Sequence, residues 1–297
     1  MAGLTTESRN LEFKELDSQS TIEIISAINS EDKKVAFAVE RVIPEITAAV
    51  DAASMRFDRG GRVIYVGSGT SGRIAETDAS EIAPTFDTEP ERFIALQSGV
   101  ILQSKDGSSE DIEEGAIRAL QEIELQETDI VFGIAASGRT PFVIGALRYA
   151  KSIGALTISL SSNSKSLLAP HSDISICCEV GPEVIYGSTR MKSGTSQKLI
   201  LNLFSTTLMV KQGRTFGNLM SHMRVANAKL QNRATRIVME ATGCDMERAR
   251  ASLAEADNKI AIAILLLLSG APVELCKHEF ELTGGRIRTA LANLGAK

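Results

Sequence analysis

The chain has 297 residues, of which 43% are hydrophobic and 23% are charged, and its formal net charge is −5. These values are typical of a globular protein with a sizeable core and room for two domains. The acidic balance, the absence of tryptophan and an aromatic content of 4% argue against nucleic-acid binding, which needs a basic face and stacking aromatic rings.

The sequence offers no sign of secretion, membrane insertion or metal binding. It starts without the apolar core of a secretory leader, and its longest apolar run, residues 260–268, is too short to cross a bilayer. We therefore expect a cytoplasmic protein with no membrane partner. The cysteines and the three histidines show no metal-ligand spacing, so no metal is expected.

The first part of the chain is predicted to be helical. Residues 1–17 are expected to be mobile, and one helix should be capped by Ser20 or Thr21 and another should begin at Ser30. Pro44 falls inside the second apolar pattern, so we expect it to kink or split that helix.

The sequence is organised around residues 62–86. A buried strand is predicted at 63–66, followed by the glycine- and hydroxyl-rich loop 67–72 and a helix. Because Pro84 disfavours helical dihedrals at the residue before it, the helix should end near Ile82. Backbone N–H groups and a helix N-terminus at such a loop favour a bound anion, usually a phosphate.

Strands and helices then alternate. Further strands are predicted at 92–96, 130–135, 155–160 and 174–178, with helices at 110–123, 141–153 and 164–169. This alternation predicts an α/β fold, a doubly wound five-stranded parallel sheet with the flavodoxin-like strand order 2-1-3-4-5. In that order the ends of the first and third strands flank the ligand site.

The loop after the predicted third strand repeats the chemistry of the first loop. Residues 135–141 are small and hydroxyl-bearing, and Pro141 suits the first turn of a helix. The fourth strand ends in serines and Asn163, which add donors to the same edge. These polar ends converge on one edge, which indicates a phosphate-binding site.

The rest of the chain is predicted to be helical. A long helix should follow residues 187–195 and stop at Gly213, and another should span 218–241. We therefore predict an N-terminal helical segment (1–57), a ligand-binding domain (58–240) and a small helical bundle (241–297).

A dinucleotide site is the first alternative. Gly67, Gly69 and Gly72 match the pattern GxGxxG. That fingerprint also needs an acidic residue at the end of the second strand, where this chain has 95–98, Ala-Leu-Gln-Ser. A compact sugar phosphate suits the two loops better.

Three segments resemble the signatures of the N-acetylmuramic acid 6-phosphate etherase family. They are YVGSGTSGRIAETDASEIAPTF, GIAASGRTPFVIGAL and GSTRMKSGTSQKLILNLFST. The resemblance covers most of the chain and implies a sugar isomerase (SIS) domain with a C-terminal three-helix bundle of the ubiquitin-associated type. It also implies cleavage of the D-lactyl ether of N-acetylmuramate 6-phosphate, no metal or organic cofactor, and a homodimer with sites at the subunit interface. The implied role is cell-wall sugar recycling.

This chemistry needs two carboxyl groups in opposite protonation states. A base removes the proton at carbon 2, an acid protonates the departing lactyl oxygen, and water adds to the unsaturated aldehyde. The resemblance assigns the acid to Glu81 and the second catalytic glutamate to Glu110. We expect Glu81 at a helix C-terminus, which raises its pKa, and Glu110 at a helix N-terminus, which keeps it ionised.

The SIS resemblance also assigns the phosphate site. The hydroxyls of Ser71, Ser137 and Thr140 are expected to hold the phosphate, with backbone groups of Gly69, Thr70 and Gly138. Arg139 and Lys192 are candidate cations near the substrate, or else solvated cations at helix ends. The chain departs from the family pattern at 97–109, which is shorter and lacks an extra glutamate, and at Ile82-Ala83, where Cys-Pro is usual.

Two other functions fit the same domain. A sugar-phosphate sensor of the glucokinase regulatory protein type would bind the ligand without reaction, and the Glu81–Glu110 pair distinguishes the enzyme from it. An aldose–ketose isomerase is a third, weaker alternative.

Overall fold

The computed structural model describes residues 4–101, 103 and 108–296 and divides into two compact units. The first unit comprises Met1–Ser80 and Glu91–Ser205, and the second comprises Glu81–Pro90 and Thr206–Lys297. These units differ from the three segments predicted from the sequence, because the end of one helix and all residues after 205 pack together.

The first unit begins with short 3₁₀ turns, where we predicted a mobile tail. The turns are η1 (Thr5–Glu7), η2 (Leu11–Phe13) and η3 (Leu16–Ser18). Leu4 and Thr6 are only 2% and 1% exposed. Tertiary contacts therefore order a segment that has no helical periodicity of its own.

Two helices follow, and their boundary lies at the proline. Helix α1 (Thr21–Glu40) begins after Ser20, whose backbone N–H donates to the Glu23 carboxylate at 2.8 Å. The predicted start at Ser30 is wrong, because α1 continues through it. Helix α2 (Ile43–Phe57) carries Pro44 in its first turn, so the predicted split is confirmed.

The sheet confirms the predicted fold class and strand order. All five strands are parallel, and their order is β2-β1-β3-β4-β5. The central strand β1 pairs with both β2 and β3, with Val63 opposite Phe93 and Ile130. The strands are β1 (Val63–Gly67), β2 (Phe93–Gln97), β3 (Ile130–Ile134), β4 (Leu156–Ser161) and β5 (Ile174–Cys177).

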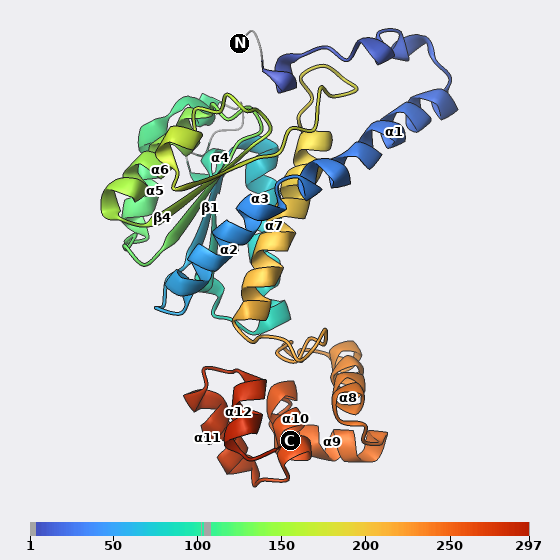
Figure 1. Cartoon of the computed structure of the whole chain (residues 1–297), viewed down its shortest axis with the longest axis vertical. Coiled ribbons are helices and arrows are strands. Elements are labelled where there is room, and N and C mark those ends of the chain that lie inside the picture. The colour runs from blue at the N-terminus through green and yellow to red at the C-terminus, as the bar shows by residue number, and fades with distance from the viewer. Residues whose placement is uncertain (1–3, 102, 104–107, 297) are drawn as a thin grey trace. The chain divides into compact units, whose positions relative to one another are not determined.

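Helices cover both faces of this sheet, with α5 and α6 on one side and α2, α3 and α7 on the other (Figure 1). On the second side the rings of Phe132 and Phe204 meet edge to face at 5.2 Å. The remaining elements that lie wholly or largely in this unit are α3 (Gly69–Phe86), η4 (Pro90–Arg92), α4 (Ser98–Ile101), η5 (Ser108–Asp111), α5 (Glu113–Glu122), α6 (Pro141–Ile153), η6 (Ala169–His171) and α7 (Lys192–Lys211); the last residues of α3 and α7 belong to the second unit.

Three predicted boundaries in this unit are wrong. Helix α3 runs past Pro84 to Phe86, because a proline removes only its own N–H and Asp87 N still donates to Ala83 O at 3.0 Å. Helix α5 begins at Glu113, so Glu110 lies in the 3₁₀ turn before it. Residues 164–168 form turns instead of a helix.

The second unit is helical. Its five helices in the described part of the chain are α8 (Ala228–Thr242), α9 (Met246–Glu255), α10 (Ile260–Ser269), α11 (Val273–Leu282) and α12 (Ile287–Asn293). Helix α8 starts ten residues later than predicted because Asn227 caps it.

Four helices follow Gly243 in the described part of the chain, where we predicted three. The apolar face of α8 joins their core, in which α10 is almost fully buried. No single helix of the described residues is long and apolar enough to cross a membrane; α10 and α11 meet that test only as a pair bent by 117°.

Candidate active site

A cleft of about 570 Å³ opens at the carboxyl ends of β1 and β3. This is the place where a sheet of this strand order binds ligands. The loops after both strands line it, so the predicted convergence of the two loops is borne out by the geometry.

The loop after β1 presents Ser68, Gly69, Thr70 and Ser71 to the cleft. Gly69 has a φ of +54°, a conformation that side chains disfavour. The N-terminus of α3 therefore starts inside the cleft, with its unpaired N–H groups. The Oγ atom of Ser68 is shielded from solvent and has no hydrogen-bond partner among the described residues, so it can donate to an anion.

The loop after β3 supplies a second helix N-terminus. Ser137, Arg139 and Thr140 line the cleft, and Thr140 is the N-cap residue of α6. Gly138 is buried and does not line the cleft. Its φ of +68° turns the loop, and its carbonyl accepts a hydrogen bond from Leu167 N at 2.8 Å. Its N–H donates to Ala135 O at 2.9 Å, within the loop.

Carboxylates face these donors. Glu110, Asp111 and Glu7 all line the cleft. Desolvation and the adjacent charge of Asp111 raise the pKa of Glu110, although the residue remains exposed and water offsets part of the desolvation. The helix N-terminus that we predicted at Glu110 is wrong, because Glu110 lies in a 3₁₀ turn before α5 and a second acid stands beside it.

Glu81 does not line this cleft. It lies ten residues beyond Ser71 on α3, about 15 Å along the helix axis. Its side chain is exposed, and α3 continues for five residues after it, so it does not occupy the helix C-terminus as predicted. One chain therefore brings Glu110 to the phosphate loops but leaves Glu81 away from them.

The two candidate cations have different environments. Arg139 is exposed and lines the cleft. Lys192 is 1% exposed and its Nζ lies 2.5 Å from Glu31 Oε2, so it is part of a buried ion pair and does not line the cleft. Its backbone N–H also donates to the Glu183 carboxylate at 3.0 Å, which anchors the start of α7.

Asp78, in the motif that contains Glu81, is structural. It is 6% exposed and accepts hydrogen bonds from Tyr65, Asn202 and Ser205, at 2.9, 2.5 and 3.1 Å. Burial raises its pKa, and these hydrogen bonds offset part of the shift. The carboxyl therefore ties α3 to β1 and α7.

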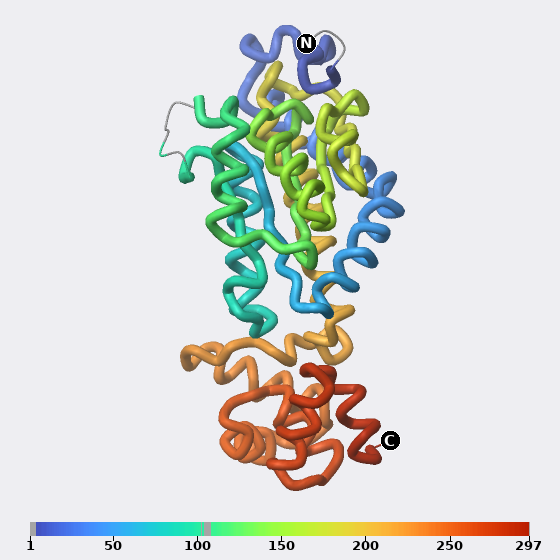
Figure 2. The backbone as a smooth tube through the Cα atoms, turned by 90° about the vertical axis from the view of Figure 1, so that its left-hand side faces the viewer, coloured from blue at the N-terminus to red at the C-terminus, as the bar shows by residue number. Residues whose placement is uncertain are grey.

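The sequence analysis missed the N-terminal wall of the cleft. Leu4 and Glu7 line it together with Gly187 and Thr189. Figure 2 shows the N-terminal turns beside the segment around residue 185 at one end of the first unit. Asn163, which we placed on the same edge, could have indicated this wall. Its side chain hydrogen-bonds both to Thr6 of the N-terminal turns and to Ala136 of the loop after β3.

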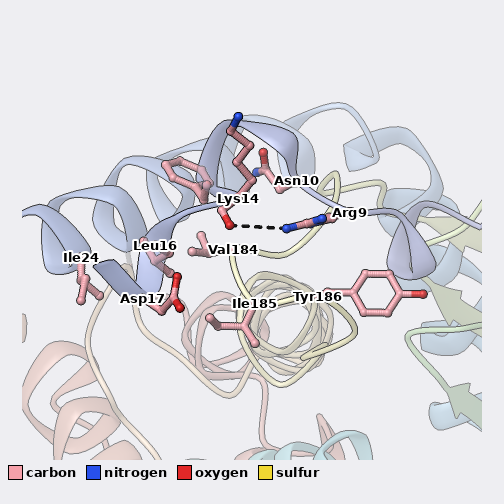
Figure 3. A pocket seen from close by; sticks show the side chains of 10 residues that line it. Arg9, Asn10, Lys14, Leu16, Asp17, Ile24, Val184, Ile185 and Tyr186 are labelled. Carbon is pink, nitrogen blue, oxygen red and sulfur yellow. Dashed lines mark hydrogen bonds between the residues drawn. The ribbon is translucent and has the colours of Figure 1, made fainter. Parts of the chain in front are cut away.

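A neighbouring pocket of about 410 Å³ shows how that wall is supported. Leu16, Ile24 and Ile185 project into it from the N-terminal turns, α1 and the loop before α7 (Figure 3). Arg9 donates to the carbonyl of Lys14 at 3.4 Å, which closes the turns on themselves.

No group of three metal-ligating side chains occurs among the described residues. Residues 102 and 104–107, which are part of the divergent segment before Glu110, lie outside the described residues.

Comparison with known proteins fixes the family. An N-acetylmuramic acid 6-phosphate etherase of Mesorhizobium japonicum is 46% identical over 98% of this chain and 95% of its own length. The chain belongs to the N-acetylmuramic acid 6-phosphate etherase family. An etherase of Aliivibrio fischeri is 45% identical over 99% of this chain and 98% of its own length.

Broader comparisons describe the domain that the family uses. Residues 42–151 match the model of the glucokinase regulatory protein N-terminal SIS domain. A phosphoheptose isomerase structure from Francisella tularensis aligns with a TM-score of 0.51 at 19% identity, over 65% of this chain and 99% of that one. This likeness establishes the fold of the first unit.

Proposed function

We propose that this chain cleaves the D-lactyl ether of N-acetylmuramate 6-phosphate and releases N-acetylglucosamine 6-phosphate and D-lactate. The observation that carries this conclusion is near-full-length identity of 46% to an etherase, combined with a cleft that holds both phosphate loops and Glu110. The substrate is therefore a small sugar phosphate, and the reaction belongs to the recycling of cell-wall sugars in the cytoplasm.

The phosphate is held by two helix N-termini. The first residues of α3 and the N-cap residue of α6 line the same cleft, with hydroxyls from Ser71, Ser137 and Thr140. Gly69 and Thr70 contribute backbone donors, and Ser68 Oγ adds a donor that the sequence analysis had not assigned to the site. The arrangement fixes the non-reacting end of the sugar.

Glu110 is the base in this mechanism. With the ring open, the aldehyde at carbon 1 acidifies the proton at carbon 2, and Glu110 removes it. A carboxylate with a raised pKa is a stronger base than an ordinary glutamate, because its pKa is closer to the working pH. This physical reason replaces the helix N-terminus that we had invoked.

Glu81 is the acid, and we propose that a second subunit supplies it. The acid protonates the lactyl oxygen as the carbon–oxygen bond breaks, and water then adds to the unsaturated aldehyde. Because Glu81 is far from the cleft of its own chain along α3, a homodimer with sites at the interface accounts for both glutamates.

Exposed apolar side chains support this assembly. Ile22, Ile25 and Phe37 of α1 are 70%, 58% and 64% exposed, and Ile43 of α2 is 50% exposed. One end of α1 extends past the sheet and its covering helices (Figure 1). Such a surface is unusual for a lone subunit and suits a second copy.

Two experiments test the proposal. Purified protein is incubated with N-acetylmuramate 6-phosphate, and D-lactate is measured; a sensor that only binds sugar phosphate would release none. For the interface, Glu81→Gln and Glu110→Gln proteins are unfolded, mixed and refolded. Half of the dimers are then mixed and each holds one intact site, so about a quarter of wild-type activity returns. No recovery in verified mixed dimers would place both glutamates in one chain.

A further inference from the structure

A separate pocket of about 220 Å³ lies entirely within the second unit. It is formed by residues 221–225, by the turn 257–261 between α9 and α10, and by Phe280 of α11; Asp87 and Arg214 complete it. None of these residues lines the catalytic cleft. The mechanism proposed above makes no use of them.

Arg214 is the unusual group in this pocket. Its Nε atom is shielded from solvent and has no hydrogen-bond partner among the described residues. Burial lowers its pKa, but a guanidinium stays charged at neutral pH. The guanidinium is half-buried, and the charges of Glu89 and Asp87 stabilise it in part. Its unpaired Nε still leaves one buried donor unsatisfied, and an anion that accepts from this donor would remove that penalty.

The carboxylates of the pocket already have partners. Asp87 Oδ1 accepts from Arg224 Nε at 2.6 Å, and Asp257 Oδ2 lies 3.0 Å from Lys277 Nζ. Among the described carboxylates none forms an ion pair with Arg214 or with Lys259. Two positive charges of the pocket therefore have no close ion pair among the described residues, at Arg214 and at the exposed Lys259; the more distant charges of Glu89 and Asp87 stabilise Arg214 in part.

The charge of Arg214 also affects the neighbouring His222. It is 6% exposed, with Nδ1 3.0 Å from Ser221 Oγ and Nε2 3.0 Å from Gly285 O. Because a carbonyl only accepts, Nε2 carries the hydrogen and Nδ1 accepts from Ser221. Burial and the charge of Arg214 lower the pKa of His222 to about 4.

Part of the pocket lining is apolar. Met223, Ile260 and Phe280 form this part, and the Phe280 ring stacks on His222 at 5.5 Å between centroids. A small cavity lined both by two cations and by apolar groups matches an anion with a short carbon body. The guanidinium can hold two oxygens of such an anion at once.

We propose that this pocket is a binding site for a small organic oxyanion, a carboxylate or phosphate ester, distinct from the catalytic cleft. Arg214 binds the oxyanion, Lys259 adds charge at the rim, and the apolar part of the lining covers the carbon body.

The test uses NMR of the imidazole groups, because the full chain has only three histidines. Inorganic phosphate and D-lactate are titrated separately at constant pH and ionic strength. We expect a saturable shift of the His222 resonance with at least one probe, while His171 of the first unit serves as reference. Arg214→Gln should weaken that binding about tenfold or more. The charge-matched control Arg250→Gln, on the exposed side of α9, should not change it.

Two further variants keep the test decisive. Lys259 is exposed, so Lys259→Gln leaves packing intact and should weaken binding about two- to fivefold. The double variant Ser137→Ala/Thr140→Ala removes hydroxyls of the catalytic cleft and should leave the His222 curve unchanged. The proposal is overturned if neither probe saturates, if both pocket variants bind as the wild type does, or if the cleft variant abolishes the His222 shift.

Discussion

The side chain of Asn163 fixes Thr6 at the edge of the catalytic cleft. Its Oδ1 accepts a hydrogen bond from the Thr6 backbone N–H at 3.2 Å, and its Nδ2 donates to Thr6 Oγ1 at 3.0 Å. Nδ2 also donates to the carbonyls of Ala136 and Ser137 at 3.0 and 3.3 Å. One buried amide thus joins the N-terminal wall to the second phosphate loop.

Asn163→Ala should therefore impair both stability and catalysis. Loss of these buried hydrogen bonds is expected to lower the free energy of unfolding by about 2–3 kcal/mol. The loop and the wall lose their common anchor, so kcat/KM should fall by about tenfold or more. Denaturant unfolding and lactate assays measure the two effects. Asn293→Ala, at an exposed amide on α12, is the control, and an equal loss there would refute the anchoring role.

The phosphate loops predict a strict need for the phosphate. N-Acetylmuramate without phosphate should react at least about 10³-fold more slowly, because the bonds that position the sugar are lost. Thr140→Ala should lower kcat/KM by about tenfold or more, whereas Ser80→Ala, on the exposed side of α3, should not. Comparable turnover of the two sugars would be incompatible with our assignment of these loops.

The buried pair Glu31–Lys192 predicts a large effect of removing one partner. Burial opposes ionisation of Glu31, but hydrogen bonds and charge from Lys192 and Lys34 outweigh it and lower its pKa. Lys192→Met should lower the free energy of unfolding by about 3–5 kcal/mol, because Glu31 keeps a buried charge. Lys34→Met removes a 58% exposed partner of the same carboxylate, and it should lower the free energy of unfolding by less than about 1 kcal/mol.

The pH dependence of that pair has a definite sign. A glutamate with a lowered folded-state pKa contributes stability above its unfolded pKa, and this contribution is lost as the pH falls through the folded value. Between pH 7 and pH 3, the free energy of unfolding should therefore decrease less in Lys192→Met than in wild type. Parallel curves would mean that the pair does not set the pKa of Glu31.

His222 predicts a second pH effect at milder acidity. Its pKa is about 4 in the fold and about 6.5 when unfolded, so the unfolded chain binds the proton first as the pH drops. Between pH 7 and pH 4, this difference in proton binding by His222 should lower the free energy of unfolding of the wild type by up to about 3 kcal/mol. His222→Gln should lack that loss, and His171→Gln should retain it. The measurement needs a buffer without phosphate or carboxylate, which could occupy the adjacent pocket.

The sheet and the position of the cleft at its carboxyl edge could be predicted from the sequence, because both depend on short sequence patterns. The apolar run before Gly67 and the small residues after Ile134 identify two buried strands and their loops, and the strand order follows from alternation. The phosphate residues Ser71, Ser137 and Thr140 come together for the same reason.

The remainder depends on contacts between distant residues. The N-terminal turns have no periodicity, and their order comes from Asn163, about 157 positions away in sequence from Thr6. The burial of Lys192 depends on Glu31 in another helix, so its sequence neighbours suggested a substrate contact instead. The end of α3 was misplaced because Pro84 removes only its own N–H, and helical hydrogen bonding continues past it to Asp87 N.

The central claim is that Glu110 removes the carbon-2 proton while Glu81 protonates the leaving oxygen. Exchange of that proton with deuterated water, followed by NMR in the substrate alongside lactate release, tests both roles in one experiment. We predict that Glu110→Gln abolishes exchange and lactate release, whereas Glu81→Gln stops lactate release but keeps slow exchange. Exchange that persists in Glu110→Gln and disappears only in Glu81→Gln would contradict the account and reverse the two roles.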